Sequence, residues 1–429
     1  MKYAAPRGTK DILPADSRLW QSVEEVCRAL FYLYNYREIR TPLFEATELF
    51  SRSIGSTTDI VKKEMYTFPD RKGRSLTLRP EATAAVVRAG LENNLILTDN
   101  LTKLYYLGPM FRYERPQAGR QRQFHQAGVE AFGSADPLLD AEVVQLAVHL
   151  FAALGLPDLE VDINSVGCKK CQPVYREAVK AFFAANIEHM CEDCKQRFAQ
   201  NPLRILDCKE QPCQKYIEKA PAALDSLDPE CKAHFTAVVN WLNSLKVKYK
   251  INDRLVRGLD YYTRTVFEVV SKRLGAQNAV CGGGRYDDLV EEFGGKPTPA
   301  IGFAVGLERL IEILQTESRV PNAGQGPDLF IATIGEEARK VGFDLVSRAR
   351  AAGIAADLDQ LGKSLKAQMK AADRLAASAV YIIGEDELKK KSGQLKNMKT
   401  AEQKEVPFDG LIAEFSAGCG CSDDGCHCE

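Results

Sequence analysis

FRYERPQAGRQRQFHQAGVE, residues 111–130, decides the fold because it spans the end of one strand-like segment, a basic loop and most of a second strand-like segment. Lys103–Phe111 and Gln123–Phe132 are rich in Tyr, Leu, Phe and Val, which are typical of strands. Residues 112–122 between them contain four Arg and two Gln and almost nothing apolar. We therefore predict an antiparallel strand pair joined by a long basic loop. Antiparallel strands followed by helices favour an α+β core.

Three other stretches share a feature with this one: Thr77–Thr83 (TLRPEAT), Leu255–Tyr262 (LVRGLDYY) and Ala300–Leu310 (AIGFAVGLERL). Each places an Arg beside a Gly, a Pro or an aromatic residue. Arg binds phosphate and carboxylate with two parallel hydrogen bonds, and Gly lets the backbone approach a nucleotide closely. One such Arg alone is more often a surface charge, but four such stretches together indicate a single ATP site.

Side chains of the opposite polarity occur in the same stretches. Glu81, Gln126 and Glu130 could bind an ammonium group or an imidazole N–H, and Tyr261 and Tyr262 could enclose a flat polar ring. The alternative for Glu81 is an acid at a helix start, which is favourable through the helix dipole alone.

Length, charge and cysteine content limit the class of protein. A chain of 429 residues is too long for one core, so we expect two or three domains. The net charge of −1 and the apolar fraction of 45% are typical of a soluble globular protein. The first ten residues contain no apolar signal core, and no run of about eighteen apolar residues predicts a membrane span. Thirteen scattered Cys argue against a secreted disulfide framework and favour the cytoplasm.

Local patterns add expectations about single elements. Apolar spacing predicts a helix over residues 16–34 with Asp16 as its N-cap. Arg40–Phe44 is predicted to be a strand interrupted by Pro42, at a sheet edge or an interface, with a plain loop as the alternative. Asp260–Val270 and Val280–Asp287 are predicted to be strands, and the run Cys281–Asp287 is also expected to make a tight turn. After residue 327, strands alternate with helices, which indicates a small parallel or mixed sheet.

These stretches together resemble the bacterial histidyl-tRNA synthetases, a family of class II aminoacyl-tRNA synthetases. The resemblance extends from Pro6 to about Phe415, and LVRGLDYY and AVCGGGRYD (residues 279–287) are its most specific parts. It implies an α+β catalytic core with an antiparallel sheet flanked by helices, a helical insertion and a C-terminal α/β anticodon-binding domain. The expected divisions are a catalytic domain (1–320), its insertion (165–245), a linker (321–327), the anticodon-binding domain (328–415) and a disordered Cys-rich tail (416–429).

The resemblance also implies an activity. The enzyme would activate L-histidine with ATP, releasing pyrophosphate, and would transfer histidine from the adenylate to the 3′ end of tRNA(His). Mg²⁺ would accompany the β- and γ-phosphates. Arg40–Glu45 would form motif 1, at the interface of a homodimer. Position 82 is Ala where the family usually has Gly, a change that costs little at a helix start.

Residue roles follow from the same resemblance. The catalytic residues would be Arg112 and Arg257. The histidine-binding residues would be Glu81, Thr83, Gln126, Glu130, Tyr261 and Tyr262. The ATP-binding residues would be Arg112, Glu114, Arg120 and Arg309. The loop residues that contact tRNA would be Arg115, Gln117 and Arg122.

Two groups of cysteines could bind metal. Cys168 and Cys171 form one C-x-x-C pair and Cys191 and Cys194 another, with nineteen residues between the pairs, a spacing that matches a four-thiolate zinc site. The alternative, which we favour from sequence, is that these are small buried apolar side chains without metal. The tail carries further soft ligands that could bind Zn²⁺ or Cu⁺, although a metal-free appendage is favoured: Cys419, Cys421, Cys426, His427 and Cys428.

Two other functions remain as alternatives. The first is the non-catalytic paralogue of this family that regulates ATP phosphoribosyltransferase in histidine biosynthesis, which generally loses parts of the ATP site and the C-terminal module. The second is an RNA-binding protein without catalysis, which leaves the amino-acid pocket unexplained. The chain keeps Arg112, Arg257 and Arg309 and a complete module after residue 327, which favours the enzyme.

Overall fold

The computed structural model describes residues 3–55, 58, 60–96, 100–116, 119–271, 279–316 and 326–416. The chain divides into two compact units, Met1–Pro321 and Asn322–Glu429. Three sequence predictions lie outside the described residues: the role of Gln117, the linker over residues 321–325 and the tail from residue 417 onward.

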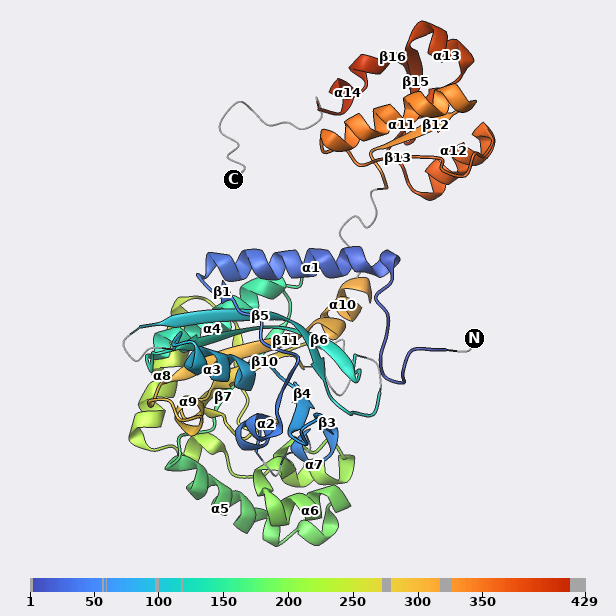
Figure 1. Cartoon of the computed structure of the whole chain (residues 1–429). Coiled ribbons are helices and arrows are strands. Elements are labelled where there is room, and N and C mark those ends of the chain that lie inside the picture. The colour runs from blue at the N-terminus through green and yellow to red at the C-terminus, as the bar shows by residue number, and fades with distance from the viewer. Residues whose placement is uncertain are drawn as a thin grey trace. The chain divides into compact units, whose positions relative to one another are not determined.

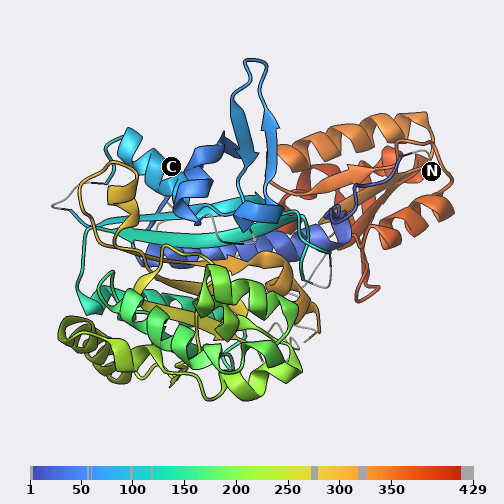
Figure 2. The same cartoon turned by 90° about the horizontal axis from the view of Figure 1, so that it is seen from below.

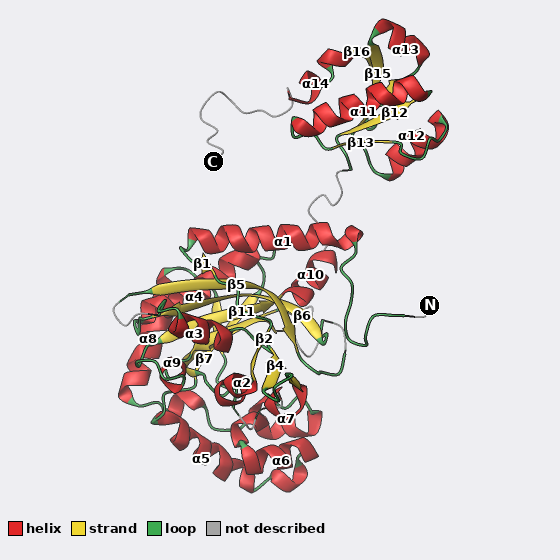
Figure 3. Ribbon diagram, viewed as in Figure 1, coloured by secondary structure: helices red, strands yellow, loops and turns green. Residues whose placement is uncertain are grey.

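The first unit is built on an eight-stranded sheet, which is the large yellow sheet in Figure 3. Its strands lie in the order β1 (Arg37–Glu38), β5 (Thr102–Phe111), β6 (Gln123–Phe132), β11 (Ala300–Gly306), β10 (Ala279–Arg285), β9 (Thr263–Val270), β7 (Glu160–Ser165) and β8 (Tyr249–Ile251). The six central strands pair antiparallel, and each edge strand pairs parallel with its neighbour. The predicted β5–β6 pair and the α+β class are confirmed.

Helices cover one face of this sheet and share a single apolar core with it: α1 (Pro14–Leu33), α4 (Pro137–Ala153), α8 (Pro229–Ser244) and α10 (Leu307–Thr316) (Figure 1). The prediction that Asp16 caps α1 is wrong, because the N-cap is Leu13 and Pro14 starts the helix. Pro is favoured there since its fixed φ suits the first turn and its missing N–H would be unpaired anyway. Asp16 lies within that first turn, where the helix dipole favours an acid.

The opposite face carries a second apolar core under α3 (Thr83–Glu92) and α9 (Leu289–Glu292). A smaller sheet lies beside it, in the order β2 (Phe44–Ala46), β4 (Ser75–Leu78) and β3 (Tyr66–Pro69), together with α2 (Thr47–Ser53) and η1 (Ile60–Glu64). Figure 2 shows the β3–β4 hairpin extending away from the large sheet. The prediction of one strand over Arg40–Phe44 is wrong, because the chain crosses here from β1 of one sheet to β2 of the other. Pro42, which cannot donate to a ladder, lies in that crossing.

The segment between β7 and β8 contains helices and loops only (Figure 3). Its elements are α5 (Cys171–Ala184), η2 (Ile187–His189), α6 (Glu192–Gln200), η3 (Pro202–Asp207), α7 (Gln211–Ile217), η4 (Ala223–Ser226) and α8. Helix α8 packs on α4. The other elements surround or adjoin a separate small core that includes Tyr175, Val179, Phe183 and Ile205. We call the segment 167–227 the insertion.

The second unit contains a five-stranded mixed sheet in the order β13 (Ala356–Leu358), β12 (Leu329–Thr333), β14 (Ala379–Ile383), β15 (Ser392–Asn397) and β16 (Gln403–Pro407). Its helices are α11 (Glu336–Ala351), α12 (Leu365–Arg374), α13 (Glu385–Lys390), η5 (Phe408–Gly410) and α14 (Ala413–Ser416). The predicted alternation is confirmed, and β12 pairs parallel with both β13 and β14. The β15–β16 hairpin was not predicted. Among the described residues of both units, no helix is long and apolar enough to span a membrane.

A buried arginine ties the central strands to the helical layer. Arg285 at the end of β10 is fully buried, and its Nε donates to Asp140 of α4 at 2.7 Å. Its two Nη atoms donate to Asp287 Oδ1 and to the carbonyl oxygen of Ser134, each at 2.9 Å. Burial raises the pKa of Asp140, although Arg285 opposes that shift. Every side-chain nitrogen of Arg285 therefore has an acceptor.

We expect Arg285→Ala to lower the free energy of unfolding by about 3–5 kcal/mol, because removing one member of a buried pair leaves an uncompensated charge. Denaturant unfolding of the purified variant measures this. The control is Arg74→Ala, which breaks an exposed ion pair with Asp70 and should change stability by less than about 1 kcal/mol. Equal effects of the two variants would contradict the structural role of Arg285.

Candidate active site

Strand alternation places the polar side chains of β6 on one face of the sheet. Val129 and Ala131 point into the core beneath α1, so Gln126 and Glu130 point to the other face. Glu268 on β9 alternates in the same way with Phe267 and Val269, which belong to the α1 core. The two-residue period of the strands therefore collects polar groups from distant segments on one surface.

Glycines on neighbouring strands leave room for these side chains. Gly302 pairs with Glu130, and a Cβ on Gly302 would lie 2.0 Å from Glu130 Oε2. A Cβ on Gly282 of β10 would lie 2.3 Å from an Nη atom of Arg257. The predicted strand over Val280–Asp287 is confirmed as β10, whereas the tight turn expected for Cys281–Asp287 is wrong, because residues 281–285 belong to that strand. Their glycines provide space beside the sheet, not a change of chain direction.

A cavity of about 260 Å³ lies against this surface. Arg112, Arg257 and Arg309, which the sequence predicts to converge, all line it. Its walls also include the following side chains: Glu114, Arg120, Phe124, Gln126 and Glu268. We call this space the arginine cavity. Residues from β6, β9, β10, α10 and the 255–262 segment meet here although they are far apart in the chain.

Each of the three arginines is held by a local contact. Arg112 Nε donates to the carbonyl oxygen of Pro80 at 2.8 Å, and its guanidinium lies 5.2 Å from the ring centre of Phe124. Arg257 pairs with Glu268 and lies 5.6 Å from the ring centre of Tyr262. Arg309 donates to the carbonyl oxygen of Ala279. These contacts hold the arginines in place before any substrate arrives.

The cavity is suited to an anion. Burial, and next the nearby Arg120, lower the pKa of Arg309, against the opposing influence of Glu114, Glu268 and Glu312. Among the described residues, the buried Nε of Arg257 has no hydrogen-bond partner, and neither has the buried Oε1 of Gln126. Buried polar atoms are nearly always paired in folded proteins. A ligand with phosphate oxygens and a hydrogen-bond donor would satisfy both.

A cluster of acids and tyrosines is buried on the same face. Thr83 Oγ1 donates to Glu130 Oε1 at 2.7 Å, and Tyr286 Oη donates to the other carboxylate oxygen. Tyr261 lies between Tyr262 and Tyr286, with ring centres 4.8 Å and 5.6 Å away. We call Thr83, Glu130, Tyr261, Tyr262 and Tyr286 the acid–tyrosine cluster. The stacking of Arg257 on Tyr262 connects this cluster to the arginine cavity.

Glu81 accepts hydrogen bonds from backbone N–H groups at the start of α3. Its Oε2 accepts from the backbone N–H of Thr83 at 2.6 Å, and its Oε1 accepts from that of Ala84 at 3.0 Å. The interpretation of Glu81 as an acid at a helix start therefore describes its contacts in this structure. It is nevertheless buried beside Thr83, which contacts Glu130. Burial raises the pKa of Glu81.

The remaining predicted residues belong to the β5–β6 loop. Glu114 Oε2 accepts from Arg120 at 2.9 Å, and both line the arginine cavity. Arg115 is exposed. Arg122 lies 3.9 Å from the ring centre of Tyr113 and donates to the carbonyl oxygen of Glu114, so it orders the loop from within.

Three functional candidates were missed by sequence reasoning. Glu268 is the one acid of β9 and lies between the apolar residues Phe267 and Val269, so strand alternation could have found it. Tyr286 lies in the AVCGGGRYD stretch, but no sequence pattern shows that it contacts Glu130. Glu308 accepts from the backbone N–H of His125 at 2.9 Å and from the His125 ring, joining α10 to β6 beside the cavity.

The cysteine prediction needs a correction. The two C-x-x-C pairs do not lie together: Cys191 and Cys194 cluster with Cys208 and Cys213, whereas Cys168 and Cys171 cluster with other residues, Asp228 and Cys231. The physical reason is that a C-x-x-C pair forms within one turn of chain, but its partners depend on how later segments pack.

The second unit carries a separate candidate surface. A cavity of about 970 Å³ lies between α11 and the start of α12. Basic side chains line it, namely Arg339, Lys340, Arg350 and Lys363. Phe343, 62% exposed, lies among them. Basic groups interleaved with an exposed aromatic ring are typical of surfaces that bind single-stranded nucleic acid.

The fold and the site define a class of protein. A central antiparallel sheet flanked by helices, followed in the chain by a small α/β unit, is the architecture of a class II aminoacyl-tRNA synthetase. Residues 8–310 match the family described as histidyl-tRNA synthetase, and residues 328–417 match the anticodon binding domain. The chain therefore belongs to the histidyl-tRNA synthetase family, as the sequence resemblance implied.

Individual relatives agree with this assignment. A histidine–tRNA ligase of Halothermothrix orenii is 53% identical over 415 residues, which cover 97% of this chain and 99% of the relative. One from Pelotomaculum thermopropionicum is 52% identical over 412 residues, covering 96% and 97%. The crystal structure of apo S. aureus histidyl-tRNA synthetase matches with a TM-score of 0.81 at 40% identity, covering 96% and 99%.

The regulatory paralogue receives less support. A solved structure described as an ATP phosphoribosyltransferase regulatory subunit/histidyl-tRNA synthetase from Bacillus halodurans matches with a TM-score of 0.66 over 89% of this chain. Its identity is 23%, and a likeness at that level shows the fold alone.

Glu130 predicts a specific dependence of stability on pH. Burial raises its pKa from an ordinary value near 4.5 to about 8, against the opposing hydrogen bonds from Tyr286 and Thr83. The folded protein therefore holds this proton over a pH range in which the unfolded chain releases it. The stabilisation is complete below about pH 4.5 and is lost as the pH rises toward 8. The melting temperature of ligand-free Glu130→Gln minus that of wild type should therefore increase as the pH rises from 5.5 to 8.5.

Thermal unfolding of both proteins over this range, roughly three pH units around the titration window, checks the expectation. The matched control is Glu177→Gln, an exposed acid on α5, whose melting-temperature difference from wild type should not change with pH. Parallel curves for Glu130→Gln and wild type would exclude a raised pKa at Glu130.

Proposed function

We propose that this chain is a histidyl-tRNA synthetase that activates L-histidine with ATP and then transfers histidine to the 3′ end of tRNA(His). The observation that carries the proposal is the meeting of Arg112, Arg257 and Arg309 in one cavity beside a buried carboxylate and three tyrosines. Guanidinium groups match a triphosphate, and the acid–tyrosine cluster matches a small polar ring.

In the first step, the histidine carboxylate attacks the α-phosphorus of ATP and pyrophosphate leaves. A carboxylate is already ionised at neutral pH, so the step requires no strong general base. Arg112 and Arg257 would stabilise the charge that develops on the α-phosphate, and Arg309 would hold the γ-phosphate. Their contacts with Pro80, Glu268 and Ala279 fix these groups in advance, which avoids the cost of reorganising them during the reaction.

Histidine recognition would depend on the acid–tyrosine cluster and Gln126. Glu130 would accept an imidazole N–H, while Tyr261 and Tyr262 would enclose the ring, and the unpaired Oε1 of Gln126 would accept a hydrogen bond from the substrate. Glu81 and Thr83 would take the α-amino group. A site with buried polar groups discriminates strongly against apolar amino acids, since those would leave the groups unpaired.

Mg²⁺ would enter with the nucleotide. Glu114 and Glu268 line the arginine cavity, and carboxylate oxygens together with substrate phosphates are the ligands that Mg²⁺ prefers. The residues therefore fit the ion. When bound, Mg²⁺ would neutralise charge on the β- and γ-phosphates.

The RNA contacts would come from both units. The β5–β6 loop with Arg115, Gln117 and Arg122 would meet the acceptor end of tRNA(His). The surface around Phe343 on α11 would bind the anticodon, since an exposed ring and four basic side chains suit unpaired bases and their phosphates.

We also propose that the enzyme acts as a homodimer in the cytoplasm. Exposed apolar side chains support a second copy as partner: Tyr32 and Leu33 at the end of α1 are 79% and 75% exposed, and Leu43 and Phe44 at motif 1 are 42% and 50% exposed. Large exposed apolar side chains are found at surfaces that bind another protein.

Arg257→Ala should lower histidine-dependent ATP–pyrophosphate exchange about a thousandfold while the protein remains folded, because a donor aimed at the developing charge is lost. The exchange assay with each of the twenty amino acids in turn measures both the activity and its specificity. Arg74→Ala removes the same charge from an exposed hairpin and should retain wild-type exchange.

Two results would count against the proposal. A variant that keeps exchange within about tenfold of wild type would remove Arg257 from the mechanism. A wild-type protein that binds histidine but shows no exchange would favour the regulatory paralogue.

Phe343→Ala should raise the KM for tRNA(His) in aminoacylation by roughly 5- to 150-fold, since stacking of a base on an aromatic ring contributes about 1–3 kcal/mol. Pyrophosphate exchange should not change, because it requires no tRNA. Trp241→Ala is the control, since Trp241 is an aromatic residue of the first unit that is 43% exposed. If both variants charge tRNA like wild type, the α11 surface does not contact the anticodon.

A further inference from the structure

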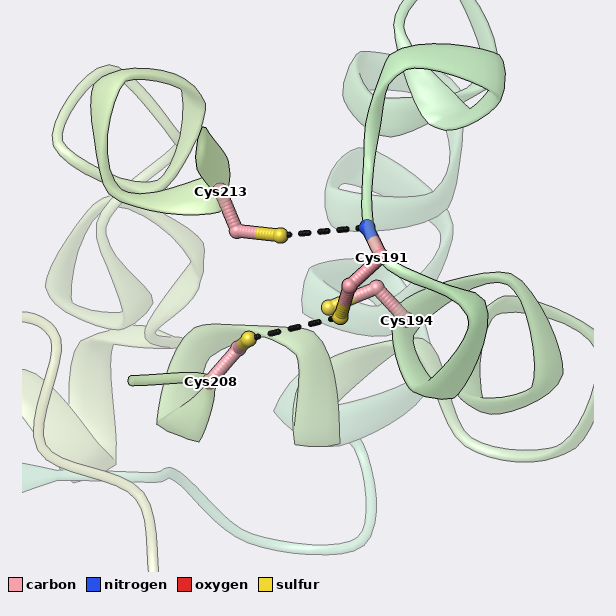
Figure 4. Close-up of side chains that lie close together, drawn as sticks. All are labelled: Cys191, Cys194, Cys208 and Cys213. Atoms are coloured by element: carbon pink, nitrogen blue, oxygen red, sulfur yellow. Dashed lines mark hydrogen bonds between the residues drawn. The ribbon is translucent and has the colours of Figure 1, made fainter. Parts of the chain in front are cut away.

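Four cysteines of the insertion point toward one another (Figure 4). The sulfur atoms of Cys191, Cys194, Cys208 and Cys213 all lie within 4.8 Å of each other. None of the four is in a disulfide. Cys194, Cys208 and Cys213 are buried, and Cys191 is partly exposed. They come from three segments: the start of α6, the end of η3 and α7.

We propose that these four cysteines bind one structural Zn²⁺. Thiolate ligands at about 2.3 Å in a tetrahedron place neighbouring sulfurs about 3.8 Å apart. The Sγ atoms of Cys191 and Cys208 are 3.7 Å apart, in agreement with that geometry. Four protein ligands leave no open position, which is the arrangement of structural and not catalytic zinc sites, and four soft sulfurs select zinc over Mg²⁺ or Ca²⁺.

The surrounding backbone supports thiolates at these positions. The N–H of Cys191 donates to Cys213 Sγ at 3.3 Å, and the N–H of Glu210 donates to Cys208 Sγ at 3.4 Å. Cys191 is the N-cap residue of α6 and Cys194 lies in its first turn, where the helix dipole favours negative charge. The two ligand pairs are therefore held by local hydrogen bonds and by the start of a helix.

Packing in the insertion argues against four ordinary thiols. Its small core otherwise consists of apolar side chains such as Tyr175, Val179 and Phe183. Cys194, Cys208 and Cys213 belong to this core and Cys191 packs against it, yet all four sulfurs also face each other, which filling space does not require. Short elements with a small core usually need a metal or disulfides for stability. A zinc ion would join α6, η3 and α7 into one unit.

The proposed site also connects to the catalytic surface. The element η3 lies between Cys194 and Cys208 in the chain, and Arg204 within it donates to the carbonyl oxygen of Gly258. Asn201 donates to Asp260 at 3.5 Å, and Val256 packs against the insertion core. The 255–262 segment that carries Arg257 thus rests on the element that the metal would hold, so zinc would position this segment without contacting substrate.

The other cysteine cluster differs in one ligand. Asp228 stands there in place of a fourth thiol, and its Oδ1 already caps α8 by accepting from the N–H of Cys231 at 2.7 Å. Its backbone N–H donates to Cys171 Sγ at 3.2 Å. One carboxylate oxygen of Asp228 is therefore already hydrogen-bonded in this cap. The cluster has a similar number of candidate ligands but not four free thiols, so it is a matched comparison for the four-cysteine site.

Metal content of the full chain, purified without a histidine tag, tests the proposal. The wild type should contain zinc, and Cys208→Ser should contain one equivalent less per chain, whereas Cys231→Ser should keep that equivalent. Both variants keep the tail cysteines, so any metal bound there cancels in the comparison. Absence of zinc from the wild type, or loss of the equivalent in Cys231→Ser and not in Cys208→Ser, would overturn the assignment.

A second measurement decides the case in which Cys208→Ser does not fold. X-ray absorption at the zinc edge is measured on a chain in which Cys231 and the four tail cysteines are serine. Four sulfurs at about 2.3 Å should surround the ion, and a nitrogen or oxygen neighbour at about 2.0 Å would contradict the four-cysteine site. Both readouts are made without histidine, ATP or tRNA, so the result is independent of the proposed function.

Discussion

The constraint on which the site depends is the absence of side chains at a few positions of the central sheet. Gly282 and Gly302 leave space directly beside Arg257 and Glu130, and a Cβ at either position would occupy the volume of those groups. Because glycine has no side chain, the Arg257 guanidinium and the Glu130 carboxylate can lie directly against the sheet at these positions. Strands β6, β9 and β11 place Val129, Phe267 and Phe303 on the other face of the sheet, where they form the core under α1. One sheet therefore provides a rigid apolar face and an open polar face.

Charge burial explains the chemistry of that polar face. Arg257 is paired with Glu268, and Arg112 is held by the Pro80 carbonyl, but Arg309 lies near Arg120 and has its pKa lowered mainly by burial. Glu130 is buried with its pKa raised to about 8. An arginine pKa lowered by burial and a carboxyl pKa raised by burial both mark a site in which ionised groups are poorly solvated, and a charged substrate would stabilise the ionised forms. Stability of the ligand-free protein and complementarity to the ligand are thus opposed at these residues.

The insertion lies outside the sheet but supports the segment that carries Arg257. The segment carrying Arg257, Tyr261 and Tyr262 has apolar support from the second core on one side and from the insertion core on the other. Arg204 donates a hydrogen bond to the carbonyl oxygen of Gly258 in this segment, and Asn201 donates one to the Asp260 side chain. A catalytic arginine on a loop requires such support, because loops without it have many conformations. Cysteine ligands at both ends of the 191–213 stretch would restrict the supporting element.

The sequence by itself determined the class of fold, the β5–β6 pair, the alternation in the second unit and the arginines that meet in one cavity. These follow from local patterns, namely two-residue and 3.6-residue apolar periods and Arg beside Gly or aromatic residues, and from the family resemblance. Tertiary structure alone decided that Tyr286 contacts Glu130 and that the two C-x-x-C pairs belong to different clusters. The physical reason is the distance along the chain over which each pattern acts. Spacing between nearby residues specifies which of them share a turn or a face. The partner of a buried side chain is instead specified by the packing of segments that are far apart in the chain, such as those that carry Glu130 and Tyr286.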